Sequence, residues 1–288
     1  MKISTEISSI ARIVGMEKAV ELCAKAGFDA WDFSMFDMCP VDWGTRLPLQ
    51  VKNALNGPEY LNFARKLKQI SLDNGIACNQ SHAPFPVDAP AVRAFAKRAI
   101  ECTAESGGEI CVIHPDNNKS AEENAEMYWE LLPFAKSYGV KIATENMWNW
   151  EWGKEDHSSF AACATGEDFK KHLDVVNDNF FVACLDLGHA EMRGSGNGAV
   201  HMIKTLGHHL QALHIHDNDR WHDSHQIPFS MQIDFTAIVK ALKEVGYSGY
   251  FTLEANEFLK DYDESNVFEG VVKLRESATK LAQMFENS

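Results

Sequence analysis

Short apolar or β-branched runs alternate with longer amphipathic stretches along the whole chain. The short runs are typical of buried strands, whereas the longer stretches repeat apolar positions at helical spacing. Between residues 58 and 73, for example, Leu61, Ala64, Leu67 and Ile70 fall roughly on one helical face. The alternation predicts eight strands, at residues 2–7, 30–34, 75–80, 109–113, 140–144, 181–185, 212–215 and 250–253.

A helix is predicted after each strand, and local signals mark several helix ends. Ser120 and Glu123 form a capping-box pattern, Pro90 suits a first helical turn, and Gly27 suits a helix end. The helices are predicted at residues 16–25, 58–73, 89–105, 120–137, 167–176, 198–206, 235–245 and 267–285. Eight strand–helix units in one undivided chain predict a (β/α)8 TIM barrel, formed as a single domain by residues 1–288.

A doubly wound open sheet is the alternative architecture for alternating strands and helices. Such a sheet usually carries a Gly-rich phosphate loop after its first strand. Here the sequence Ser-Ser-Ile-Ala follows at residues 8–11 instead. The barrel is therefore the favoured prediction.

Composition and charge narrow the class of partner. The net charge of −14, from 41 acidic and 27 basic residues, disfavours nucleic acid and anionic membranes, which need a positive surface. The seven cysteines follow no framework spacing, which is typical of a reducing compartment. The first residues lack the apolar core of a signal peptide, and no stretch is apolar enough to span a bilayer. We therefore expect a cytoplasmic protein without a membrane or nucleic-acid partner.

Polar, metal-ligating side chains stand where six of the predicted strands end. They follow one another at intervals of about one strand–helix unit, roughly 31 residues in a barrel of about 250. In a closed barrel these strand ends form one rim, the face that carries active sites. The six residues are His82, His114, Glu145, Asp186, His214 and Glu254.

Any one of these residues alone would more simply be a hydrogen-bonded histidine or a helix cap. Three carboxylates on one rim are different, because buried like charges cost several kcal/mol unless a cation neutralises them. Glu145, Asp186 and Glu254, with His214 beside them, therefore predict a divalent metal site.

The motifs at the strand ends resemble a known family, the xylose isomerase-like barrels, and within it the sugar phosphate isomerases/epimerases. The resemblance covers most of the chain, most clearly residues 76–254. Aspartate-x-Gly-His followed by His-x-His-Asp-Asn-Asp is its most specific part. The motifs are Ser-His-Ala-Pro (81–84), Ile-His-Pro (113–115), Glu-Asn-Met (145–147), Asp-Leu-Gly-His-Ala (186–190), His-Ile-His-Asp-Asn-Asp (214–219) and Leu-Glu (253–254).

The ketose 3-epimerase branch of this family implies specific roles. One metal would lie between Glu145, Asp186, His214 and Glu254, and the substrate would be held by His189, Arg220 and Glu151. Trp-Asn-Trp at 148–150 replaces that branch's Asn-Arg-Phe, so the substrate need not be a free ketose.

The endonuclease IV-like branch uses three zinc ions, and this chain has residues at the matching places. They are His82, His114, His189, Asp223 and His225. The resemblance therefore allows additional metal, with Asp223 and His225 as ligands. The acidic net charge disfavours DNA repair, and the histidines at 82 and 114 can instead recognise sugar hydroxyls.

The resemblance and the residues together imply proton transfer through an enediolate of a small sugar. Glu145 and Glu254 would exchange the proton while His216 and the other polar groups position hydroxyls. Mn²⁺ is the expected metal, with Mg²⁺, Co²⁺ or Zn²⁺ as alternatives. A metal-dependent lyase or dehydratase on a sugar, cyclitol or C-glycoside is one alternative function. An endonuclease IV-like metallohydrolase is another.

Aromatic residues near the predicted site leave two interpretations open. Trp148, Trp150 and Trp152 alternate just past Glu145, so in an extended segment they would share one face. They could stack on a sugar or an aromatic aglycone, or fill the barrel mouth or a subunit contact. The long connection at 35–56 could be a lid or a surface loop in a homo-oligomer.

Overall fold

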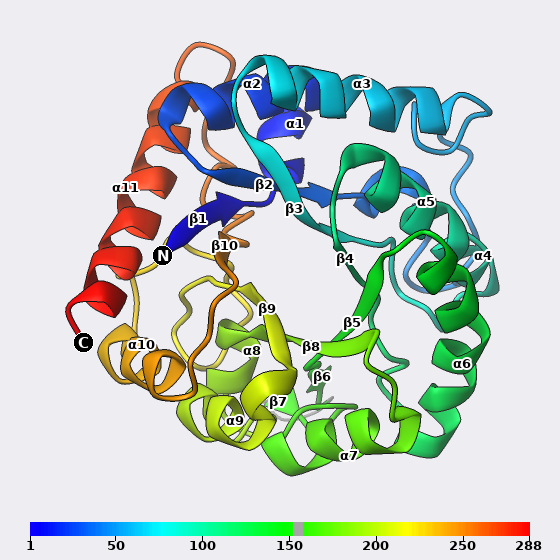
Figure 1. The fold of residues 1–288 in the computed structure, drawn as a ribbon, viewed down its shortest axis with the longest axis vertical. Coiled ribbons are helices and arrows are strands. Elements are labelled where there is room, and N and C mark those ends of the chain that lie inside the picture. The colour runs from blue at the N-terminus through cyan, green and yellow to red at the C-terminus, as the bar shows by residue number, and fades with distance from the viewer. Residues whose placement is uncertain (152–157) are drawn as a thin grey trace.

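A computed structural model describes residues 1–151 and 158–288, and a ring of parallel strands occupies its centre (Figure 1). Six strands pair in the order β2-β3-β4-β5-β8-β9, and β1 pairs with β10. Their bounds are β1 Lys2–Thr5, β2 Ala30–Ser34, β3 Ala77–His82, β4 Ile110–Val112, β5 Lys141–Glu145, β8 Phe181–Asp186, β9 Leu210–His214 and β10 Tyr250–Leu253.

Two parallel bridges close the ring. Glu6 pairs with Asp32 between β1 and β2, and Ile215 pairs with Leu253 between β9 and β10. The second junction is hydrogen-bonded, since the Ile215 amide donates to the Thr252 carbonyl over 2.9 Å. The predicted TIM barrel is therefore confirmed, and all strand ends meet at one rim.

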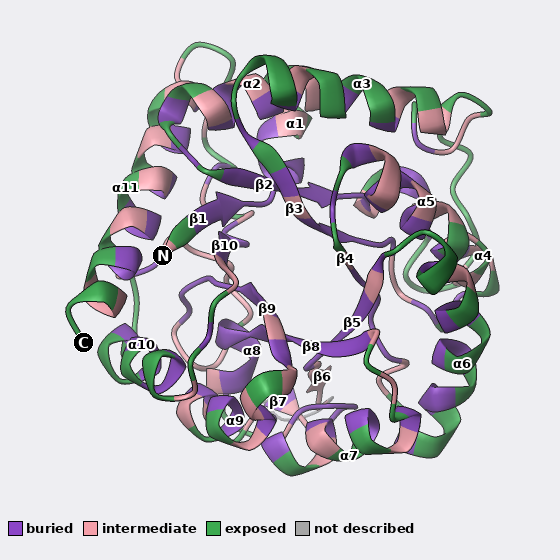
Figure 2. Cartoon of the chain, in the orientation of Figure 1, coloured by how far each residue is buried: buried purple, intermediate pink, exposed green. Residues whose placement is uncertain are grey.

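Helices surround the strands and bury one face each against them (Figures 1 and 2). Trp31 of β2, for instance, is fully buried, and its Nε1 donates to Ser71 Oγ of α3 over 2.7 Å. Burial of one such large side chain contributes roughly 1.5–3 kcal/mol. The outer helices are α2 Met16–Ala26, α3 Tyr60–Asp73, α4 Pro90–Ala94, α5 Ala96–Ser106, α6 Ala121–Ser137, α7 Gly166–Val176, α9 Ala199–Leu206, α10 Phe235–Glu244 and α11 Val267–Glu286.

The structure differs from the predicted elements at several short segments. The helix predicted at 89–105 is divided at Phe95 into α4 and α5. Helix α1 (Ser8–Val14), helix α8 (Leu187–Glu191), the 3-10 turns at Phe36–Met38 and Gly207–His209, and the pair β6 (Asn149–Trp150) and β7 (Ser158–Ser159) were not predicted. These pieces are two to seven residues long, too short to show a hydrophobic period.

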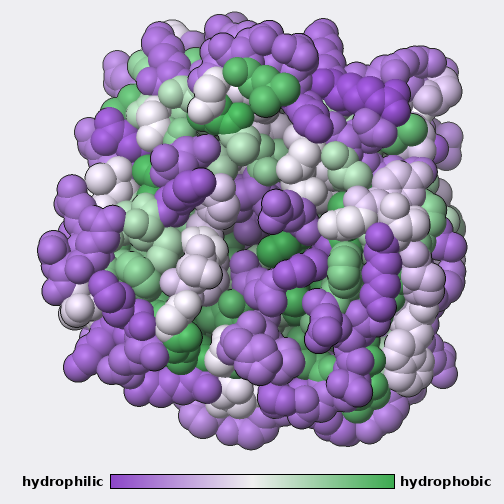
Figure 3. Space-filling model, viewed as in Figure 1, coloured by the Kyte–Doolittle hydropathy of each residue, from purple (hydrophilic) through white to green (hydrophobic). Residues whose placement is uncertain are grey.

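Among the helices of residues 1–151 and 158–288, none combines the length and apolar character needed to cross a membrane. The face shown in Figure 3 is largely hydrophilic, with hydrophobic side chains in scattered places.

Candidate metal centre at the barrel rim

Four predicted ligands converge where the carboxyl ends of the strands meet. Glu145 ends β5, Asp186 ends β8, His214 ends β9, and Glu254 follows β10 directly. Each is nearly or fully buried, and their ligand atoms all lie within 4.8 Å of one another. The parallel register pairs Asp186 with His214 across adjacent strands, which places their side chains at the same level.

The charges in this cluster do not balance by themselves. Nδ1 of His214 lies 3.1 Å from Glu145 Oε2 and 3.6 Å from Glu254 Oε2. Oδ2 of Asp186 is buried and has no hydrogen-bond partner. Three buried carboxylates beside one imidazole are an oxygen-rich donor set that suits a divalent cation. The residues present therefore fit the metal that the motifs predict.

Asp32, at the middle of β2, lies behind the imidazole of His214. Its Oδ2 lies 3.4 Å from His214 Nε2, on the side of the ring opposite the carboxylate cluster, and its side chain is fully buried. The two atoms do not have hydrogen-bond geometry, but a buried carboxylate at this distance favours a ring orientation with Nε2–H directed toward it. The sequence alone left two interpretations of Asp32 open, because a carboxylate at the end of the second predicted strand could contact the substrate or cap a helix.

A second cluster of possible ligands lies next to the first. His189, His216, Asp223 and His225 bring their ligand atoms within 4.8 Å of one another. Nε2 of His225 lies 3.1 Å and Nε2 of His189 lies 3.3 Å from Asp223 Oδ2. Nε2 of His216 lies 3.1 Å from Asp186 Oδ1, so the two clusters are contiguous.

Backbone carbonyls fix the orientation of the imidazoles. Nδ1 of His82 lies 2.8 Å from the Ala83 carbonyl. Nδ1 of His189 lies 2.9 Å from the Asn146 carbonyl, and Nδ1 of His225 lies 2.7 Å from that of Glu254. Because a carbonyl only accepts, each Nδ1 donates and each neutral ring keeps its Nε2 lone pair for the site. This is the arrangement found behind metal-ligating histidines.

Gly188 permits the second cluster to form. A Cβ at this position would lie 2.0 Å from Cε1 of His216, a distance that no packed side chain tolerates. The ring of His216 then stacks on that of His225, with centroids 3.9 Å apart. The Asp-x-Gly-His motif thus needs glycine because the His216 ring packs where a Cβ would lie, and not because of an unusual backbone conformation.

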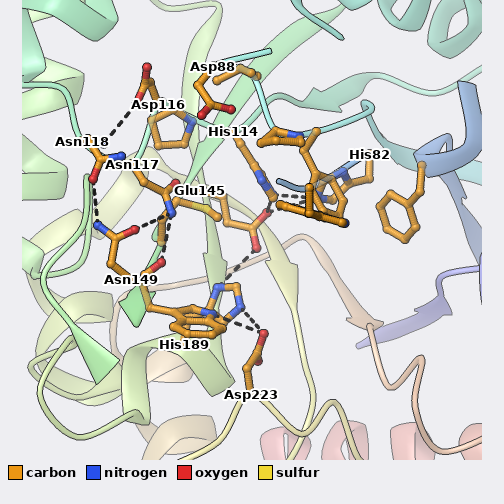
Figure 4. A pocket seen from close by; sticks show the side chains of 18 of the residues that line it. His82, Asp88, His114, Asp116, Asn117, Asn118, Glu145, Asn149, His189 and Asp223 are labelled. Carbon is orange, nitrogen blue, oxygen red and sulfur yellow. Dashed lines mark hydrogen bonds and ion pairs between the residues drawn. The ribbon is translucent and has the colours of Figure 1, made fainter. Parts of the chain in front are cut away.

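His82 and His114 cover the other side of Glu145 (Figure 4). Their Nε2 atoms lie 2.8 Å apart, and that of His114 is 3.3 Å from Glu145 Oε2. Burial and the neighbouring His82 lower the pKa of His114 to about 4, so it is neutral at neutral pH. Glu145 therefore stands between a histidine pair and the metal-ligand cluster.

The two glutamates differ in proton affinity. Burial works to raise the pKa of Glu145, but His214, His114 and His82 outweigh it and hold that pKa well below its ordinary value. Burial raises the pKa of Glu254. Pairs of carboxyl groups whose environments push their pKa values apart are typical of acid–base catalysis.

Two histidines of the second cluster have raised pKa values, because carboxylates surround them and no other positive charge among the described residues balances these carboxylates. Burial opposes protonation of His225, yet the Asp223 carboxylate raises its pKa to about 10. Asp186 and Asp223 likewise raise the pKa of His189 well above its usual range against the effect of burial. The carboxylates of the rim thus require neutralising charge, from protons or from bound cations.

Two residues predicted to hold the substrate do not line the cavity at the cluster, and one predicted aromatic neighbour is not described by the structure. Arg220 does not line the cavity described below, because its guanidinium pairs with Glu191 over 3.1 Å. Glu151 is also absent from the cavity lining, and Trp152 lies outside the described residues. Substrate contacts by Arg220 and Glu151 stay predictions.

A cavity of about 470 Å³ opens onto Glu145 and Glu254 from the rim. His82, His114 and His189 line its inner part, and Figure 4 shows them directed toward Glu145. The rest of its lining includes aromatic and amide side chains, namely Phe36, Trp43, Phe85, Trp148, Trp150, Asn117, Asn118, Asn149 and Asn256. The cluster therefore lies at the floor of a cavity large enough for an organic ligand.

Comparison with known proteins agrees with the fold and the motifs. The chain is 26% identical over 276 residues to the uncharacterized protein MJ1311 of Methanocaldococcus jannaschii, covering 86% of this chain and 85% of that protein. The fold is similar to that of a D-tagatose 3-epimerase-like protein, with a TM-score of 0.73, 22% identity, and coverage of 100% and 99%. It is also similar to that of IolI with a bound zinc atom, with a TM-score of 0.71, 20% identity, and coverage of 100% and 99%.

A family model described as a xylose isomerase-like TIM barrel matches residues 20–276, nearly the whole chain. The resemblance inferred from the strand-end motifs is thereby confirmed. The chain belongs to the xylose isomerase-like TIM barrel family.

Proposed function

We propose that the protein is a divalent-metal-dependent isomerase or epimerase of a small sugar, with Glu145 and Glu254 as its proton-transferring groups. The observation that carries this proposal is the convergence of three buried carboxylates with His214, in which Asp186 Oδ2 has no protein partner. Glu145, Asp186, His214 and Glu254 would hold the ion. Three oxygen donors and one nitrogen favour Mn²⁺, with Mg²⁺, Co²⁺ or Zn²⁺ as alternatives.

When bound, a divalent cation supplies Lewis-acid polarisation of a carbonyl and its neighbouring hydroxyl, which acidifies the adjacent C–H. Glu145, whose pKa is lowered, is ionised and able to accept the carbon-bound proton. Glu254, the second glutamate of the set, would be the group that returns the proton. Return of the proton to the opposite face of the same carbon is epimerisation. Return to the neighbouring carbon is aldose–ketose isomerisation.

Polar side chains around the glutamates would orient the substrate. His82 and His114 line the cavity beside Glu145, and His189 lies across from them. Neutral His114 can accept a hydrogen bond from a sugar hydroxyl or donate one to it. We also retain Arg220, Glu151 and His216 as candidates, although the structure places Arg220 beside Glu191 and His216 beneath His225.

The second cluster supports an additional metal, as the endonuclease IV-like resemblance implies. His189, His216, Asp223 and His225 offer three nitrogens and one carboxylate, a set that suits Zn²⁺. A metallohydrolase is therefore the second candidate function. The net charge of −14 argues against a nucleic-acid substrate. A metal-dependent lyase or dehydratase would use the same proton abstraction at Glu145 and then expel a leaving group.

Solvent-deuterium exchange tests the proposed chemistry. The metal-loaded protein is incubated in D₂O with a panel of ketoses and aldoses, and deuterium beside the carbonyl is followed by NMR. We expect exchange for at least one sugar and its loss in Glu145→Gln, with metal content measured in both proteins. Cleavage of an abasic duplex without any exchange would instead favour the metallohydrolase.

A further inference from the structure

Asn146, the residue directly after Glu145 at the end of β5, has a fully buried amide side chain. Burial of an amide is unfavourable unless its donor and its acceptor both find partners. The side chain is absent from the described lining of the cavity, so direct contact with a substrate does not explain it. Its hydrogen bonds therefore show what it does.

The Asn146 side chain pairs with the backbone of Asp186, one of the four proposed metal ligands. The Asp186 amide donates to Oδ1 over 2.8 Å, and Nδ2 donates to the Asp186 carbonyl over 2.9 Å. The backbone register between β5 and β8 ends earlier, where Glu145 pairs with Cys184. The amide thus takes the place of a main-chain partner for β8 beyond the end of that ladder.

These two bonds define the place of the Asp186 carboxylate. One of its oxygens, Oδ1, accepts from the His189 amide over 2.7 Å. The other, Oδ2, is buried and has no partner among the described residues. Because the backbone and one oxygen of Asp186 are both held, the second oxygen has a defined position, as a ligand atom requires.

The main-chain carbonyl of Asn146 holds a residue of the second cluster. It accepts from Nδ1 of His189 over 2.9 Å, and Nε2 of the same ring lies 3.3 Å from Asp223 Oδ2. Asn146 therefore contacts one residue of each cluster and is covalently bonded to Glu145. A shift of Asn146 would move groups in both clusters together.

Asn124 makes the same pair of bonds at another place in the fold. It is also buried, its Oδ1 accepts from the Asp116 amide over 2.8 Å, and its Nδ2 donates to the Asp116 carbonyl over 3.1 Å. Asn124 lies in α6, and neither it nor Asp116 belongs to the groups of possible metal ligands found in the described residues. Such pairing is thus a general way to hold a backbone, and Asn146 differs in which residue it holds.

We propose that Asn146 is a positioning residue of the metal centre, which holds Asp186 through its side chain and His189 through its carbonyl. This inference rests on the proposed function, because it concerns the same site. Asn146 itself would contact neither the ion nor the substrate. Its loss should therefore change the affinity for the ion and the geometry around it while every proposed ligand stays present.

Titration of chelator-treated protein with Co²⁺, followed by visible absorption, tests the proposal. The absorption bands report the arrangement of the ligands around the ion. Asn146→Ala should lower the affinity for Co²⁺ by about 10- to 100-fold and change the bands, because Asp186 loses its support. If this variant does not fold, Asn146→Ser replaces it, since a side chain one bond shorter does not reach both Asp186 groups.

Asn124→Ala is the matched control, because it removes the same two kinds of bond. It should destabilise the metal-free protein in urea about as much as Asn146→Ala does. Its affinity for Co²⁺ should nevertheless stay within about twofold of wild type, with unchanged bands.

Equal loss of affinity in the two variants, or wild-type affinity and bands in Asn146→Ala, would overturn the proposal. Deuterium exchange on a sugar by wild type, with no difference in Co²⁺ binding between the variants, would contradict this inference alone. The expected difference in Co²⁺ binding without exchange on any sugar would contradict the proposed function alone.

Discussion

Replacement of Asp186 by asparagine should reduce the stabilisation that divalent metal gives to the folded protein. The side chain is fully buried, and its Oδ1 accepts a hydrogen bond from the His189 amide over 2.7 Å, which caps α8. Asparagine has the same shape and keeps this acceptor. The substitution therefore removes one anionic ligand and its unpartnered Oδ2 while the local fold is retained.

The magnitude follows from linkage between binding and folding. Metal at about 1,000 times its dissociation constant stabilises the folded state by about 4.1 kcal/mol. At roughly 2 °C per kcal/mol for a chain of this size, the melting temperature should rise by about 8 °C. If Asp186→Asn lowers the affinity for the metal by 10- to 100-fold, the stabilisation at the same metal concentration falls to about 2.7–1.4 kcal/mol.

The assay is a thermal melt of chelator-treated protein with added Mn²⁺, Zn²⁺ or Mg²⁺. Asp234→Asn is the matched control, because Asp234 caps α10 through a 3.0 Å bond from the Thr236 amide and is exposed. The control should keep the wild-type shift. An equal metal-induced shift in Asp186→Asn and wild type, or no shift in wild type, would refute the reasoning.

Three further predictions follow from other contacts. Gly188→Ala should displace the His216 ring, because the added Cβ would overlap that ring, and so abolish metal binding at the second cluster. Zn²⁺ calorimetry measures this binding, and an unchanged number of bound Zn²⁺ ions would contradict the prediction. Asp32→Asn should lower the affinity of the central cluster for metal by about 10- to 100-fold in a competition titration. The reason is that the Asp32 carboxylate lies 3.4 Å from the imidazole of His214. Glu105→Gln should cost less than about 1 kcal/mol in urea denaturation at pH 7, because Arg65 lowers the pKa of this carboxyl. A depressed folded-state pKa gives stability that is present above the unfolded-state value and lost as pH falls through the folded-state value, so the difference should vanish in acid.

The barrel and the convergence of the four proposed ligands could be predicted because each depends on a local pattern. Strand and helix periods are readable over ten residues, and each ligand stands at a strand end. When parallel strands close into a barrel, their carboxyl ends meet at one rim, so no further sequence signal is needed to bring these residues together. The ligands Glu145, Asp186, His214 and Glu254 meet for this reason.

The second cluster and the support behind His214 depend on contacts that no local pattern encodes. Asp217 and Gln226 form an antiparallel bridge, which turns the segment between them back toward the rim. That turn brings Asp223 to the histidines. Asp32 has an equally good sequence explanation as a helix cap, and only the closed ring places it against His214. Arg220 shows the reverse case, since the fold directs a predicted substrate group to Glu191 instead.

The metal content of the purified and dialysed chain tests the central claim most directly. Inductively coupled plasma mass spectrometry of protein loaded with Mn²⁺ or Zn²⁺ should find at least one divalent ion per chain in wild type. Asp186→Asn should retain less of the ion at the central set than wild type after the same dialysis, whereas Asp223→Asn should retain less only of an ion at the second cluster. Wild-type protein that retains no divalent ion after loading would contradict the account.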